Sequence, residues 1–85
     1  MGVSKKDPVV RVPIDYAKLR GRIIEFFGTQ GAFAQAIGWS EKSVSDWLNN
    51  KKYFPYEAIL SSVEVLEIQH ADVGSYFFTK LVQAS

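Results

Sequence analysis

The chain has 85 residues, 47% of them hydrophobic, and a formal net charge of +1. This length supports one compact domain with a modest core and excludes two domains. The sequence contains no cysteine, which excludes disulfides and thiolate metal sites, and it has no apolar run long enough for a membrane helix or a signal peptide. We therefore expect a soluble, cytoplasmic protein without a membrane partner.

The first 14 residues are expected to form an arm, because they contain two prolines and a short alternation of apolar and polar residues. Three cations of this arm can reach a phosphate backbone or a minor groove: Lys5, Lys6 and Arg11. Two alternatives are open: residues 9–12 pair with another strand, or the arm is a loose tail.

The first predicted helix begins after Asp15, a good N-cap, and ends at Gly28. Its apolar residues recur at helical spacing: Tyr16, Leu19, Ile23 and Phe26 or Phe27. We expect this stripe to pack behind the next two helices. Three cations lie away from the stripe, either as phosphate ligands or on a solvated face: Lys18, Arg20 and Arg22.

Residues 29–49 predict two short helices joined by a tight turn. Thr29 and Ser40 are good N-caps, and Gly38 supplies the left-handed backbone that a sharp helix end requires. We expect Trp39 to be buried in the turn. The buried face of the first of these helices is predicted to contain Phe33, Ala34 and Ile37.

The second of these helices has two different faces. Its apolar side carries Val44, Trp47 and Leu48. Its polar side carries Lys42, Ser45, Asp46 and Asn49. A helix with such a polar side can present it to a groove.

A polar loop at residues 49–52 follows, and Pro55 marks the start of a fourth helix. The apolar stripe of that helix is predicted to be Tyr56, Ile59, Leu60, Val63 and Leu66. Residues 71–78 form a shorter segment with three successive aromatic residues at its end. The last large apolar side chains either close the core or form a dimer or partner interface: Tyr76, Phe77, Phe78 and Leu81.

The charges are distributed unevenly along the chain. Residues 1–22 carry six Lys or Arg and two acids, whereas residues 53–85 carry one and four. This asymmetry suggests a basic side built from the arm, the first helix and the pair Lys51 and Lys52. The alternative is that these are only solvated charges.

Three positions of the two-helix unit match a known pattern: a small residue early in the first helix, glycine at the turn, and an aliphatic residue in the second helix. Ala34, Gly38 and Val44 hold these positions, and Gln30 begins the first helix. This spacing resembles the phage repressor and Cro-like family of helix-turn-helix proteins. The segments FGTQGAFAQAIG and SEKSVSDWLNNKK look like small Cro-type regulators of phages of Gram-positive bacteria.

The resemblance, over roughly residues 15–78, implies an all-α, lambda-repressor-like fold. That fold is a compact bundle of about five short helices that contains a helix-turn-helix. The implied organisation is an N-terminal arm at residues 1–14, a DNA-binding domain at 15–78 and a C-terminal tail at 79–85.

The resemblance also implies a sequence-specific transcriptional regulator in a bacterial host cell. It would bind double-stranded operator DNA as a symmetric homodimer, with residues 41–49 in the major groove. The side chains expected to read bases are Glu41, Lys42, Ser45, Asp46 and Asn49. Those expected to bind phosphates are Gln30, Ser40, Ser43, Asn50, Lys51 and Lys52. No cofactor, metal or small-molecule substrate is implied.

Glu41 and Asp46 depart from the family pattern, because many relatives carry glutamine, arginine or lysine there and phosphate repels both acids. Asp46 either accepts a hydrogen bond from cytosine or indicates that this copy of the fold has moved toward protein contacts. The alternative function is therefore an antirepressor or modulator that binds a partner phage repressor through Trp39, Tyr53 or the terminal aromatics. An enzyme is not expected, since no nucleophile is placed beside an oriented base.

Overall fold

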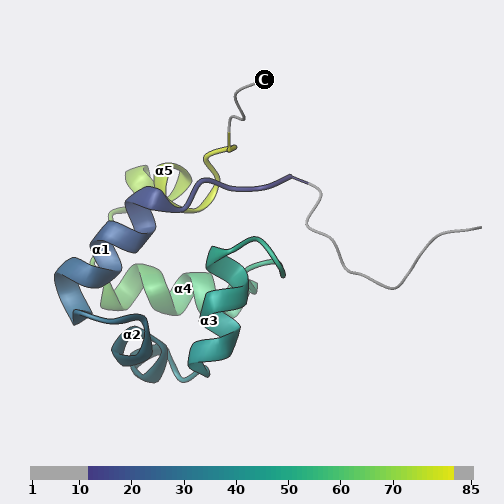
Figure 1. The fold of residues 1–85 in the computed structure, drawn as a ribbon. Helices are drawn as coiled ribbons and strands as arrows, with labels where there is room; N and C mark the ends of the chain where they lie inside the picture. The colour runs from purple at the N-terminus through teal and green to yellow at the C-terminus, as the bar shows by residue number, and fades with distance from the viewer. Residues whose placement is uncertain (1–11, 82–85) are drawn as a thin grey trace, which may run out of the picture.

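Five α-helices and one short 3-10 helix make up residues 12–81, the part of the chain that this computed structural model describes (Figure 1). In chain order they are α1 (Ala17–Phe27), α2 (Gln30–Ile37), α3 (Glu41–Leu48), α4 (Tyr56–Val65), the 3-10 helix η1 (His70–Asp72) and α5 (Val73–Phe77). The predicted all-α class is confirmed. None of the helices in this range is long and apolar enough to cross a membrane. The predictions for the three arm cations lie outside the described residues.

The unit of α2, turn and α3 begins and ends where its capping residues predict. The Thr29 hydroxyl accepts a hydrogen bond from the Ala32 N–H at 3.1 Å and so caps α2. Gly38 is left-handed, with φ 80° and ψ 26°, a conformation that glycine adopts at little cost. The Ser40 hydroxyl accepts from the Ser43 N–H at 3.1 Å and caps α3. These three predictions are confirmed.

The core forms where α2 contacts α1, α3 and α4, with α5 packed on α1. Side chains that are fully buried come from several of these elements: Leu19, Ile23, Phe33, Val44, Leu66 and Phe77. Phe54, in the loop between α3 and α4, joins an aromatic cluster. Its ring centroid lies 4.5 Å from that of Trp47, 5.2 Å from that of Phe77 and 5.9 Å from that of Tyr16. Phe54 is a core residue that the sequence pattern does not predict.

The buried face of α4 differs from the predicted stripe. Tyr56 is 73% exposed and Leu60 is also exposed, so their predicted burial is wrong. Ala58 and Ser62 are buried instead. The Ser62 hydroxyl donates to the Ala58 carbonyl at 2.6 Å, and a serine with its hydroxyl satisfied in this way can be buried at little cost. The inward face is therefore rotated by roughly one residue from the apolar stripe.

Trp39 follows the turn glycine, and its predicted burial in the turn is wrong. The side chain is exposed, and its ring stands edge-on to that of Trp47, with 5.1 Å between the ring centroids. Trp47 is the buried member of this pair and already contacts the aromatic cluster. Trp39 therefore lies at the outer edge of the cluster, where it is available to a partner.

The two ends of the described chain lie side by side (Figure 1). Backbone hydrogen bonds of 2.7 and 3.0 Å join residues 13–15 to residues 79–81, around an antiparallel bridge between Ile14 and Lys80. Asn50 attaches the loop between α3 and α4 to this pair. Its amide oxygen accepts from the Ile14 N–H, and its amide nitrogen donates to the Ile14 carbonyl, both at 2.9 Å. Three segments far apart in the sequence thus meet at one end of the bundle.

Candidate functional site

The polar side of α3 carries the residues predicted to read bases. Glu41, Lys42 and Asn49 are exposed, and Ser45 is half-buried. Asp46 is only 7% exposed, so its predicted exposure to a ligand on this face is wrong. The physical reason lies in the chain that follows α3.

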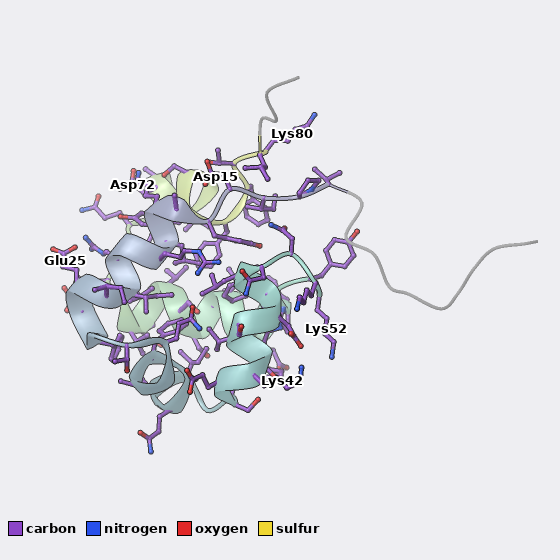
Figure 2. The ribbon with its side chains drawn as sticks, in the orientation of Figure 1. Asp15, Glu25, Lys42, Lys52, Asp72 and Lys80 are labelled. Carbon is purple, nitrogen blue, oxygen red and sulfur yellow. The ribbon has the colours of Figure 1, made fainter. Side chains whose placement is uncertain are left out.

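Asp46 is buried because the loop after α3 folds back over it. The N–H groups of Lys51 and Lys52 donate to the Asp46 carbonyl at 2.8 and 3.3 Å. The Asp46 carboxylate oxygen Oδ2 lies 3.3 Å from Lys42 Nζ and 3.8 Å from Lys52 Nζ, and Figure 2 shows these two lysines on the same side of the molecule. One largely buried carboxylate therefore pairs with two lysines whose own side chains stay 81% and 64% exposed.

Arg20 of α1 brings together Gln30 and Asn49, two of the predicted DNA ligands. Its guanidinium donates to the Asn49 side-chain oxygen and to the Leu48 carbonyl, both at 3.0 Å, and reaches Gln30 Oε1 at 3.5 Å. The Asn49 amide nitrogen donates to the Ser45 carbonyl at 2.9 Å and to the Ser45 hydroxyl at 3.2 Å. The polar groups of Asn49 thus serve to connect α3 to α1.

The other two cations of α1 also have partners within the protein. Lys18 Nζ donates to the Ser75 hydroxyl at 3.0 Å. Arg22 donates to the Leu66 and Glu67 carbonyls, at 3.0 Å each, at the end of α4. The cations of α1 therefore fasten this helix to α3, α4 and the segment of α5, in addition to their contact with solvent.

The remaining predicted phosphate ligands differ in how they are placed. The Ser40 and Ser43 hydroxyls are hydrogen-bonded to each other at 3.0 Å, while the Asn50 side chain is taken up by the backbone of Ile14. Lys51 is exposed, and no hydrogen bond or ion pair of its ammonium group is found within residues 12–81. Of this group, Lys51 is the one best placed to meet an anion from outside.

An apolar groove of about 370 Å³ opens where the terminal segments meet the loop between α3 and α4. Its lining consists of Val12, Ile14, Tyr16, Asn50, Lys52, Tyr53, Phe54, Ile59, Phe77 and Phe78. Burial raises the pKa of the Tyr16 hydroxyl, because removal from water disfavours the charged phenolate. Val12, Tyr53 and Phe78 are the exposed apolar members of the wall. The groove shares Lys52 with the ion pairs of Asp46.

The predicted interface residues separate into two pairs. Phe78 is 61% exposed and Leu81 is also exposed, so both are accessible to a partner. Tyr76 and Phe77 are buried, and the structure assigns them to the core rather than to an interface. Phe77 packs edge-on against Phe54, because it lies on the buried side of α5, which faces the aromatic cluster.

Fold and site together define a small all-α protein in which a polar helix face with paired charges lies near an apolar groove. The chain belongs to DUF739, a family described as proteins of unknown function, whose model matches residues 12–80. It is similar to a solved structure, the solution structure of the modulator of repression (MOR) of the temperate bacteriophage TP901-1 from Lactococcus lactis. The two share 46% sequence identity with a TM-score of 0.67, over 76% of this chain and 88% of that chain. No curated protein matches the sequence.

These comparisons bear on the resemblance to phage Cro-like regulators, from which we predicted the function. The similar structure is that of a phage modulator of repression, which agrees with the phage regulator that the sequence predicts. The family is DUF739, and the finer assignment to the Cro-like family stays a prediction.

Proposed function

We propose that this protein modulates repression by binding a phage-type repressor protein, and that it does so without binding operator DNA itself. The observation that carries the proposal is the 46% identity to a phage modulator of repression over 76% of this chain. This role is the alternative given by the sequence, and the likeness favours it over operator binding.

The contacts of the predicted DNA ligands also favour repressor binding over operator binding. Affinity for DNA comes largely from cations that neutralise phosphates, and specificity comes from side-chain groups that reach base edges. Lys42 and Lys52 are paired with Asp46, and the Asn49 side chain is engaged within the protein. DNA binding would therefore have to break existing contacts before it forms its own.

The apolar groove is the surface we assign to the repressor. Stable protein contacts are centred on buried aromatic and aliphatic side chains with polar residues at the rim, and the groove has this composition. Its exposed wall offers Tyr53 and Phe78, and its rim carries Lys52. We therefore expect the repressor to insert an apolar side chain there.

Operator binding by a homodimer is the second candidate function. It is favoured by the exposure of Lys42 in the first turn of α3 and of Lys51 just after the helix. In this alternative, α3 would enter the major groove, and a two-fold dimer would be needed to read two half-sites.

A gel shift distinguishes the two candidates. The DNA that flanks the gene for this protein serves as the operator, and a repressor encoded beside that gene serves as the partner. The DNA is mixed with this protein, with that neighbouring repressor, and with both, at about 50 mM and about 200 mM salt. We expect no shift with this protein alone and an altered repressor shift when it is added. A shift by the protein alone that weakens steeply with salt would contradict the proposal and favour operator binding.

Matched variants locate the repressor contact. Phe78→Ala removes an exposed side chain of the groove, whereas Leu60→Ala removes an exposed apolar side chain of α4 that does not line it. The first variant should weaken the effect on the repressor, and the second should leave it unchanged. Equal effects of both substitutions would remove the groove from the proposal.

A further inference from the structure

Glu41 lies against the first turn of α2. Its carboxylate oxygen Oε1 is 3.2 Å from the position that a Cβ atom would take on Gly31, the second residue of that helix. A Cβ atom at this position would make an unusually tight contact with Glu41, so the glycine leaves room for the carboxylate. The first turn of a helix carries partial positive charge and favours an anion, so Glu41 brings an internal anion to a place where a phosphate is expected.

Asp46 forms ion pairs with two cations of the same face. Its Oδ2 contacts the ammonium groups of Lys42 and Lys52, which are the groups that a phosphate would need. The loop after α3 bonds to the main-chain carbonyl of Asp46 and its carboxylate is largely buried, whereas the lysines project into solvent. Asp46 therefore occupies two cations that a phosphate would need, and Glu41 places a negative charge beside the first turn of α2.

We propose that Glu41 and Asp46 are specificity-determining residues that exclude nucleic acid from the face formed by α2 and α3. The inference rests on the proposed function in one respect, namely that the working partner is a protein. A phosphate that approaches α2 is repelled by the Glu41 charge, and a phosphate that approaches Lys42 or Lys52 competes with Asp46. In this proposal the unit of α2, turn and α3 keeps its fold while its affinity for DNA is suppressed.

The size of the effect follows from counterion release. Each lysine that contacts a phosphate contributes about 0.9 to the slope of log affinity against log salt, which is roughly tenfold in affinity near 0.1 M salt. Removal of the Asp46 charge makes Lys42 and Lys52 available for such contacts, and removal of the Glu41 charge reduces the repulsion of a phosphate near α2. Affinity for duplex DNA of any sequence should then rise by about 10- to 100-fold, and the slope should steepen by up to about two.

The test compares two double variants that change the net charge equally. Glu41→Gln with Asp46→Asn removes the two acids of the α2 and α3 face. Glu25→Gln with Asp72→Asn removes two exposed acids that lie on another side of the molecule from Lys42 (Figure 2). Wild type and both variants are titrated against a labelled scrambled duplex by fluorescence anisotropy at about 50 mM and about 200 mM salt. Circular dichroism melting verifies that each variant is folded.

We expect the first variant to bind the duplex with the stated gain and the second to stay near wild type. Equal binding by both double variants, or no gain in the first, would overturn the inference. Because Asp46 is buried, the single variant Glu41→Gln is measured as well, and a folded Glu41→Gln protein with unchanged affinity for the duplex would also overturn it.

Repressor binding, measured on the same samples, keeps this result separate from the proposed function. A wild-type protein that binds repressor while the double variant gains no DNA affinity would overturn the inference alone. A wild-type protein that binds operator DNA tightly by itself would overturn both.

Discussion

Replacing Asn50 with alanine should loosen the end of the bundle where the terminal segments meet the loop between α3 and α4. The substitution removes two part-buried hydrogen bonds to the Ile14 backbone, each 2.9 Å long. At about 0.5–1.5 kcal/mol per bond, their loss costs about 1–3 kcal/mol. Asn50 also has a φ of 60°, and a left-handed conformation is less tolerable for alanine by about 1 kcal/mol.

Thermal melting followed by circular dichroism measures this loss. A domain of this size shifts its Tm by about 4–8 °C for each kcal/mol, so Asn50→Ala should melt roughly 10–30 °C below wild type. Asn50→Gly should melt above Asn50→Ala, because glycine keeps the backbone conformation while losing the same bonds. Lys51→Ala, at the exposed neighbouring position, should leave the Tm unchanged. A Tm for Asn50→Ala within about 2 °C of wild type would refute the assigned role of these bonds.

Four other substitutions test the packing and the contacts between helices. Ala34→Leu should cost about 1–3 kcal/mol by overpacking a buried site, and an unchanged melting curve would contradict that placement. Phe77→Ser should lower the free energy of unfolding by about 3–5 kcal/mol or unfold the domain. Phe78→Ser should leave the circular dichroism spectrum intact. Similar stability of the two variants would mean that Phe77 is not a core residue. Arg20→Lys keeps the charge but loses the hydrogen bonds of the guanidinium group to Asn49 and to the end of α3. The free energy of unfolding, measured in urea, should therefore fall by about 1–2 kcal/mol. A wild-type value would mean that those hydrogen bonds contribute nothing to stability.

The unit of α2, turn and α3 could be predicted from the sequence because its signals are local. The Thr29 and Ser40 hydroxyls each act on an N–H three residues further along, and Gly38 acts through its own backbone angles. No information about distant parts of the chain is needed for such contacts. The predicted helix boundaries in this region therefore agree with the structure.

Burial could not be predicted in the same way where it depends on distant segments. Asp46 lies on the polar side of its helix by spacing, and it is the following loop that covers it. Phe77 and Phe78 are adjacent and chemically identical, and only the position of α5 relative to Phe54 decides that the first is buried. On α4, Ser62 is buried because its hydroxyl finds a partner within the helix, which hydrophobic periodicity does not detect.

The role of the candidate site was the feature that could least be predicted from the sequence. Residue types and spacing identify Lys42 and Asn49 as possible DNA ligands, but they do not tell which intramolecular partners these side chains already have. The ion pairs of Asp46 and the hydrogen bonds of Arg20 supply that information. They shift the functional interpretation from DNA toward protein.

The most direct test of the central claim is an isothermal titration of this protein into the purified, DNA-free neighbouring repressor. We predict a saturable heteromeric complex whose Kd changes little between low and physiological salt, because the contact is centred on the apolar wall around Phe78. Absence of heat and of any complex with the repressor, under conditions where the protein alone binds operator DNA, would contradict the account.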